Sequence, residues 1–266
     1  GETMNRRSFA QSVGSAVILS AIPGSSALTQ DSAASKAGKV MAIAAHPGDG
    51  MFTMCAALAK QIERGGTGVL LSLSLGEKGA PKNIPVQQYG SMQRTATENG
   101  ARLIGAEAIF LDYPDAEIPF NEESSLRVCD LIRQQRPHAV VTHWSGSWHK
   151  DHQNCHLIVR DAVFYAGLET LSRKYPAHAV SKIFYAENWE DAANFVVDTY
   201  IDIDSVYEKW MQACDLYPMW RGQTGFFRYN DYYSSLSVMR GCLSGSRHAV
   251  ALMSDINQRT ERLQTL

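Results

Sequence analysis

From residue 39 onward, short apolar runs alternate with longer segments of helical periodicity. The first pair is the run KVMAIAA (39–45) and the segment 51–65, where apolar side chains recur at helical spacing until two glycines end the pattern. Further strand-like runs lie at 67–75, 108–113, 139–144, 182–187 and 196–203, and helices are expected at 86–104, 124–135 and 152–171. Strands separated by helices predict βαβ units, and unbroken apolar runs predict strands covered on both faces. We therefore expect an α/β fold, a Rossmann-like three-layer sandwich with a mostly parallel sheet.

The length, composition and charge of the chain limit the number of domains and the kinds of partner. The chain has 266 residues, 45% of them hydrophobic, which suits one sizeable domain at 39–266. Its last third, 204–266, is rich in aromatic residues and reads as mostly helical. The formal net charge is −2, so the chain lacks the basic surface typical of nucleic-acid binders. No apolar run in the body of the chain is long enough to predict a membrane span.

The first 38 residues have a different character. Paired arginines, Arg6 and Arg7, precede a mildly apolar stretch of small residues. This pattern resembles a twin-arginine export signal, and the polar segment 28–38 reads as a linker. The alternative is a tail with no targeting role. We expect an exported protein, periplasmic or extracellular, with residues 1–38 outside the folded domain.

Two polar loops follow predicted strands. The first, HPGDG, carries His46 and Asp49, and the second, SGSWHKDH, carries His149, Asp151 and His152. In open parallel sheets, ligands bind beyond the carboxyl ends of the strands, so these side chains are placed to converge. Two histidines and one carboxylate, with a position left for water, form an established catalytic zinc set.

Each loop alone is a weak signal, because glycine and proline mark ordinary turns. Their joint position after two strands of one domain favours a metal site over two structural turns. The spacing of His46 and Asp49 lets both side chains point the same way across one turn. The adjacent Asp151 and His152 suit one ligand and one orienting or proton-handling group.

The motifs around these loops resemble those of the PIG-L (LmbE-like) de-N-acetylases, zinc-dependent enzymes that remove acetyl groups from N-acetylglucosaminyl compounds. Beyond the two loops, the resemblance rests on four further segments. They are LSLSLGEKG (71–79), RTATE (94–98) followed by ARLIGA (101–106), FLDYPDAEI (110–118), and RPHAVVTHW (136–144) leading to HKDH (149–152). It covers about residues 39–160 well and the C-terminal third only loosely.

The resemblance implies a role for each loop residue. His46, Asp49 and His152 would bind one zinc ion. His149 would stabilise the oxyanion and protonate the leaving amine, and Asp151 would hold His149 in place and tune its pKa.

The resemblance also implies a substrate, a small-molecule amino sugar or glycoside. Arg94 and Asp115 match positions that contact the sugar in the family. The structural alternative for Arg94 is an exposed ion pair with Glu98, four residues further along a helix.

The first loop departs from the family pattern, which is typically HPDDE. Gly48 stands where the family has its general-base aspartate, and Gly50 stands at the final acidic position. General-base catalysis is worth about 10²–10⁴-fold, so this change predicts slower deacetylation with metal binding retained. Another group such as His149, Asp151 or a more distant carboxylate could serve as the base; the hydrolysis could act on a different substrate; or the chain could bind sugar without turnover.

We therefore expect a zinc-dependent hydrolase that uses metal-activated water to remove an N-acetyl group from an N-acetylglucosamine-type sugar or glycoside. The alternative is a carbohydrate-binding pseudoenzyme of the same fold. A nucleotide-binding Rossmann protein ranks last, because no G-x-G-x-x-G follows the first strand.

Overall fold

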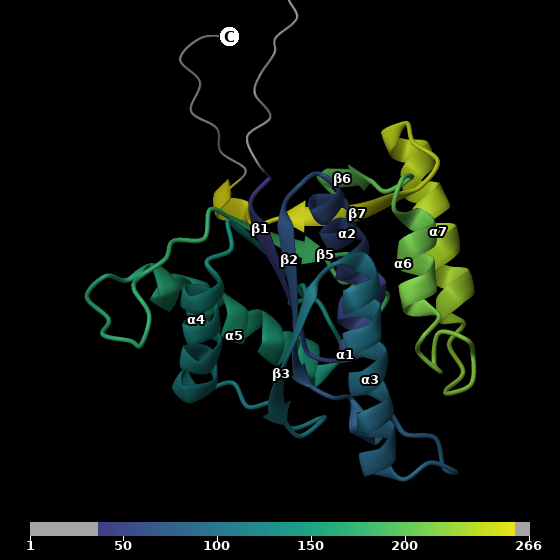
Figure 1. Cartoon of the computed structure of the whole chain (residues 1–266), viewed down its shortest axis with the longest axis horizontal. Coiled ribbons are helices and arrows are strands. Elements are labelled where there is room, and N and C mark those ends of the chain that lie inside the picture. Colours follow the sequence, from purple (N-terminus) through teal and green to yellow (C-terminus); the bar gives the residue numbers. More distant parts are fainter. Residues whose placement is uncertain (1–36, 259–266) are drawn as a thin grey trace, which may run out of the picture. The chain divides into compact units, whose positions relative to one another are not determined.

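The computed structural model describes residues 37–258, which lie within one compact unit. Seven strands form a single sheet in the order β3-β2-β1-β4-β5-β7-β6 (Figure 1). Except for its last two residues, the expected export signal and linker at 1–38 lies outside the described residues, so it stays a prediction.

The first five strands run parallel to one another. They are β1 (Lys39–Ala44), β2 (Thr67–Ser74), β3 (Glu107–Tyr113), β4 (Ala139–Thr142) and β5 (Lys182–Ala186). The strand β7 (Ala249–Ser254) pairs antiparallel with both β5 and β6 (Thr199–Asp202). The expected α/β fold with a mostly parallel sheet is confirmed.

Helices cover both faces of this sheet (Figure 1). One layer holds α2 (Cys55–Glu63), α3 (Val86–Ile104), α6 (Tyr207–Cys214) and α7 (Tyr229–Ser244), and the other holds α4 (Glu122–Gln135) and α5 (Lys150–Gly167). Alternate residues of β1 pack into the two layers: Ala42 and Ala44 into the first, Met41 and Ile43 into the second. Within 37–258 no helix has the length and apolarity to cross a membrane.

Two expectations differ from the structure. The helix expected from residue 51 begins at Pro47, as the single turn α1 (Pro47–Asp49) and a π-helical turn (Gly50–Met54) that continue into α2. The last third is not only helical, because AVALMS enters the sheet as β7. An antiparallel strand of this kind takes its partners from distant segments, so local periodicity carries little sign of it.

Candidate metal centre

The first loop becomes the start of a helix, and this fixes the spacing of two side chains. His46 has extended backbone, with φ −128° and ψ 157°, and Pro47 occupies the first helical position, which its fixed φ suits. The following turn brings Asp49 back toward His46, so that Oδ2 of Asp49 lies 3.0 Å from Nδ1 of His46.

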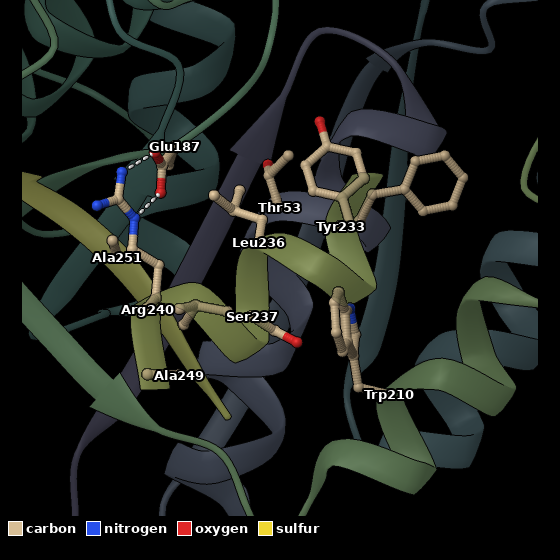
Figure 2. Close-up of a pocket in the computed structure, with 11 residues that line it drawn as sticks. Thr53, Glu187, Trp210, Tyr233, Leu236, Ser237, Arg240, Ala249 and Ala251 are labelled. Carbon is tan, nitrogen blue, oxygen red and sulfur yellow. Dashed lines mark hydrogen bonds and ion pairs between the residues drawn. The ribbon is translucent and has the colours of Figure 1, made fainter. Parts of the chain in front are cut away.

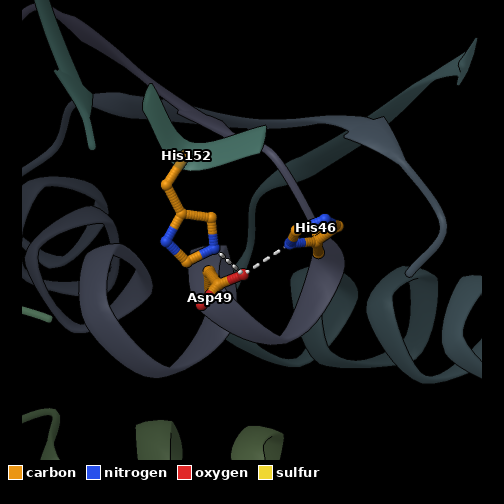
Figure 3. Close-up of side chains that lie close together, drawn as sticks. All are labelled: His46, Asp49 and His152. Carbon is orange, nitrogen blue, oxygen red and sulfur yellow. Dashed lines mark hydrogen bonds and ion pairs between the residues drawn. The ribbon is translucent and has the colours of Figure 1, made fainter. Parts of the chain in front are cut away.

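The third side chain comes from α5. The strand β4 lies next to β1 in the sheet, and the segment that follows β4 leads into α5. There Nε2 of His152 lies 3.1 Å from Oδ2 of Asp49, so the two imidazoles flank one carboxylate oxygen (Figure 3). The structure thus brings together His46, Asp49 and His152, the three residues expected to bind metal.

The donor set suits a zinc ion. One ligand atom from each of the three side chains lies within 4.8 Å of the others. Tetrahedral zinc with bonds of about 2.0–2.2 Å places its ligand atoms roughly 3.4 Å apart, close to the contacts seen here. Five carboxylates surround the imidazoles of His46 and His152, which favours a cation; they belong to Asp49, Asp115, Asp151, Glu190 and Asp191.

Asp191 orients one of the two metal-site imidazoles. Its Oδ1 lies 2.8 Å from Nδ1 of His152, and its Oδ2 lies 2.8 Å from Nδ1 of His143. Nε2 of His143 accepts a hydrogen bond from the Ala45 backbone, so Nδ1 of His143 is the donor. Burial raises the pKa of Asp191, but the two histidines outweigh it and leave that pKa well below its ordinary value. Nε2 of His152 is therefore left to face the metal position, as is usual for a metal-bound histidine.

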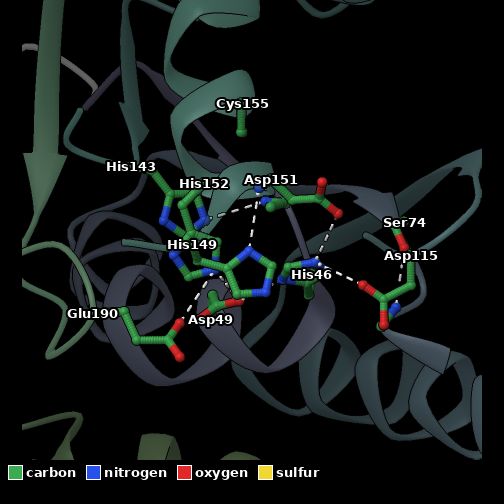
Figure 4. Close-up of polar contacts among 12 residues, drawn as sticks. His46, Asp49, Ser74, Asp115, His143, His149, Asp151, His152, Cys155 and Glu190 are labelled. Atoms are coloured by element: carbon green, nitrogen blue, oxygen red, sulfur yellow. Dashed lines mark hydrogen bonds and ion pairs between the residues drawn. The ribbon is translucent and has the colours of Figure 1, made fainter. Parts of the chain in front are cut away.

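Two other carboxylates orient His46. Its Nε2 lies 3.1 Å from Oδ1 of Asp115 and 3.4 Å from Oδ2 of Asp151 (Figure 4). The sequence led us to expect a sugar contact for Asp115 and an orienting role toward His149 for Asp151. In the structure both carboxylates face His46, and Asp151 reaches His149 only through its backbone N–H. Asp115 also lines the cleft, so its contact with a sugar stays a prediction.

His149 begins α5 as its N-cap residue. Its Nδ1 accepts the backbone N–H of Asp151 at 3.2 Å, so the proton of the neutral ring lies on Nε2. Partial burial, followed by the charges of His152 and His46, lowers the pKa of His149 to about 4. A neutral ring with an Nε2–H is suited to donating a hydrogen bond to a developing oxyanion.

The loop after β5 supplies residues that the sequence motifs did not reveal. Oε2 of Glu190 lies 3.5 Å from Nε2 of His152, and Glu190 and Asp115 stand on opposite sides of the cluster (Figure 4). Burial, then the charge of Asp49, raises the pKa of Glu190 to about 7. Asn188 donates a hydrogen bond to Oδ1 of Asp49 at 3.1 Å. The signal that could have found them is the polar segment NWED (188–191), which directly follows the strand predicted at 182–187.

The cluster forms one wall of a cleft that holds about 550 Å³ of unfilled space, part of it open to solvent. Its lining consists of His46, Gly48, Asp49, Phe52, Gly76, Gly79, Gln93, Asp115, His149, Glu190, Met219 and Tyr229. This lining includes no lysine or arginine. Arg94, expected to contact sugar, does not line the cleft; its guanidinium carbon lies 4.2 Å from the centre of the Phe110 ring.

A second cavity lies on the other side of Phe52, between α7 and the sheet (Figure 2). Its walls are largely apolar, and its two charged side chains, Glu187 and Arg240, form an ion pair with each other. It offers no group of metal ligands, so the cleft is the candidate site.

Comparison with known proteins agrees with a candidate site at His46, Asp49 and His152. The model of the PIG-L family, described as GlcNAc-PI de-N-acetylase, matches residues 41–163. A 4-oxalmesaconate hydratase of Pseudomonas putida is 22% identical over 211 residues, which is 76% of this chain and 79% of the relative.

Two solved structures share the fold. The 4-carboxy-2-hydroxymuconate hydratase GalB of Pseudomonas putida superposes with a TM-score of 0.77 at 20% identity, over 85% of this chain and 99% of that one. The N,N'-diacetylchitobiose deacetylase of Pyrococcus horikoshii superposes with a TM-score of 0.70 at 19% identity, over 82% of this chain and 83% of that one. The matched segment 41–163 includes His46, Asp49 and His152, so the part of the chain that holds these three residues is similar to the PIG-L family.

Proposed function

We propose that this chain is a zinc-dependent hydrolase that removes the N-acetyl group of an amino sugar or its glycoside. The observation that carries the proposal is the convergence of His46, Asp49 and His152 in an open cleft, with each imidazole backed by a carboxylate. The PIG-L family match and the diacetylchitobiose deacetylase among the structural neighbours support the reaction class.

Each reacting group has a counterpart in the cleft. A divalent ion bound there would polarise the acetyl carbonyl and promote ionisation of water. His149 donates its Nε2–H to the carbonyl oxygen as negative charge develops. Glu190 accepts a proton from the attacking water and returns it to the amine when the C–N bond breaks. The products are acetate and a free amino sugar.

Glu190 is placed to act as the general base that Gly48 cannot provide. Residue 48 is a glycine and has no side chain to accept a proton, whereas the Glu190 carboxylate lines the same cleft and approaches His152 to 3.5 Å. It comes from the loop after β5 rather than from the first loop. The base would thus reach the reacting water from another wall of the site.

The lining of the cleft suits an uncharged substrate. The lining of the cleft also includes Phe52, Met219 and Tyr229, and no lysine or arginine is among its residues. A neutral acetamide and a sugar ring fit such a lining. An anionic substrate would have no lysine or arginine to pair with and would depend on the bound ion alone.

A hydratase is the second candidate. It is favoured by the match to 4-oxalmesaconate hydratase over three quarters of the chain and by the loss of the acidic residue at position 48. The acidic, lysine- and arginine-free lining makes it the weaker candidate, since that relative is named for a polycarboxylate. The binding-only pseudoenzyme is not favoured, because the named relatives are enzymes.

One experiment separates these candidates. The zinc-loaded protein is incubated with N-acetylglucosamine, with N,N'-diacetylchitobiose and with 4-oxalmesaconate. Acetate and free amine from either sugar, lost in His149→Ala, support the deacetylase. Addition of one water to 4-oxalmesaconate without acetate release supports the hydratase instead, and neither product from any probe contradicts both.

We also propose that Arg6 and Arg7 direct export through the twin-arginine route, on the strength of the sequence pattern alone. Replacing both arginines by lysine should retain the protein in the cytoplasm of a bacterial host. Equal export of the two forms would contradict the proposal.

A further inference from the structure

A tryptophan stands exposed at the rim of the candidate site. Trp148 directly precedes His149, and its side chain is 68% exposed although it is one of the largest apolar groups in the chain. The centre of its ring lies 5.7 Å from that of His149 and 6.1 Å from that of Trp189. Trp189 in turn stacks on Phe227, with ring centres 4.1 Å apart and planes 12° from parallel.

The loop that carries this indole is held in place. The backbone N–H of Trp148 donates to the carbonyl of Glu190 at 3.2 Å, and Ala193 donates to the carbonyl of Gly146 at 3.1 Å. The indole of Trp144 donates to the carbonyl of Ala193 at 2.8 Å. A Cβ at Gly146 would lie 1.9 Å from that same carbonyl oxygen, so only glycine permits this close approach. The exposed ring therefore belongs to an ordered loop rather than to a flexible tip.

We propose that Trp148, supported by Trp189, forms a subsite, here called the indole platform, for a second pyranose ring joined to the N-acetylated sugar. The inference rests on the proposed function, because it places the acetamide at the metal ligands and the next ring beyond His149. The apolar C–H face of a pyranose stacks on an indole face, while its hydroxyl groups stay in water.

The polar neighbours of Trp148 and its continuity with the cleft favour a sugar ring as the occupant. Ser145 and Lys150, on either side of Trp148 in the sequence, are exposed and polar. The platform is also continuous with the cleft, since His149 lines the cleft and contacts Trp148.

The first test compares the zinc-loaded wild type, Trp148→Ala and Trp148→Phe on N,N'-diacetylchitobiose and on N-acetylglucosamine. Loss of one stacked ring should lower the preference for the disaccharide, measured as the ratio of kcat/KM values, by roughly tenfold, mainly through KM. Trp148→Phe should keep most of that preference. The matched control is Phe164→Ala, which removes an aromatic side chain of similar exposure, 64%, from α5.

A binding measurement separates this inference from the proposed reaction. Chitobiose has no acetyl group to lose, and calorimetry should show that wild type binds it about tenfold more tightly than glucosamine, with the difference lost in Trp148→Ala. This result supports the platform even if no probe is deacetylated, in which case only the proposed reaction fails. The platform is overturned if the two sugars bind equally, if Phe164→Ala behaves like Trp148→Ala, or if sedimentation shows that Trp148→Ala merely dissociates a dimer.

Discussion

Met219 fills the space beside Gly48. A Cβ built on Gly48 would lie 2.9 Å from Sδ of Met219 and 3.3 Å from Cε2 of Phe52. The methionine belongs to the C-terminal part of the chain, beyond the segment matched by the family model. The position at which the family pattern has an aspartate is therefore not only emptied of its carboxylate but also packed against a thioether.

This packing predicts that Gly48→Asp needs the flexible Met219 side chain to move aside and the Phe52 ring to shift slightly, at a modest cost in stability. Overpacking typically destabilises a protein by about 1–3 kcal/mol, and Met219→Ala should relieve part of that cost. Thermal or denaturant unfolding of wild type, both single variants and the double variant measures the coupling, expected at about 0.5–3 kcal/mol. Additive effects of the two substitutions would show that Met219 does not restrict residue 48.

His152→Ala should lose the metal. The substitution removes one of three ligands and leaves the Asp191 carboxylate without one of its two histidine partners. Metal analysis after dialysis should show zinc near one equivalent in the wild type and little in the variant. His138→Ala, which changes an exposed histidine remote from the cleft, is the control. Full zinc content in His152→Ala would refute the ligand assignment.

Glu190→Gln should reduce acetate release by about 10²–10⁴-fold, the usual size of general-base catalysis. The amide keeps the shape of the side chain but accepts protons far less readily, so zinc content should stay close to that of the wild type. Steady-state kinetics and metal analysis on the same preparation test both statements. Glu187→Gln, on the same loop but paired with Arg240 outside the cleft, is the matched control. A variant with undiminished kcat would exclude Glu190 as the base.

His156 should make the fold sensitive to acid. It is 3% exposed, its ring lies beside Tyr185, and its Nδ1 lies 3.0 Å from the carbonyl oxygen of His143. Burial lowers the pKa of His156, whereas in the unfolded chain the pKa of histidine is about 6.5. The unfolded state therefore binds the proton first as pH falls, and the free energy of unfolding decreases below about pH 6.5.

The measurement for this prediction is urea unfolding at several pH values from neutral down to acid. His156→Gln keeps a donor for the carbonyl but cannot take up a proton, so its stability should fall less steeply with pH. The difference in slope is at most about 1.4 kcal/mol per pH unit. His138→Gln controls for the loss of an exposed imidazole. Parallel slopes for wild type and His156→Gln would contradict the prediction.

Much of the fold and part of the site follow from the sequence. The apolar runs from β1 to β5 fall within one residue or two of the observed strands, because buried parallel strands need continuous apolar side chains. The convergence of His46, Asp49 and His152 was predictable because they follow strands that are neighbours in the sheet. The general rule that ligands bind at the carboxyl ends of parallel strands was enough to pair the two loops.

The remaining site residues depend on tertiary contacts that leave no local pattern. Asp191 is 39 residues from His152, and an acidic residue in a polar loop looks like an ordinary solvated charge. Asp115 and Asp151 both turn toward His46, a choice set by the packing of three separate loops rather than by any spacing. The β7 strand was missed because its partners, β5 and β6, are far from it in the sequence.

Two parts of the chain build the candidate site. The candidate metal ligands come from 41–163, whereas Asn188, Glu190 and Met219 come from the segment beyond it. Substitutions in that later segment can therefore change the proton acceptor, the rim and the substrate without disturbing the ion's own ligands. The reaction of such a site can therefore change during evolution through substitutions in the later segment alone, while the residues that would bind the metal stay the same.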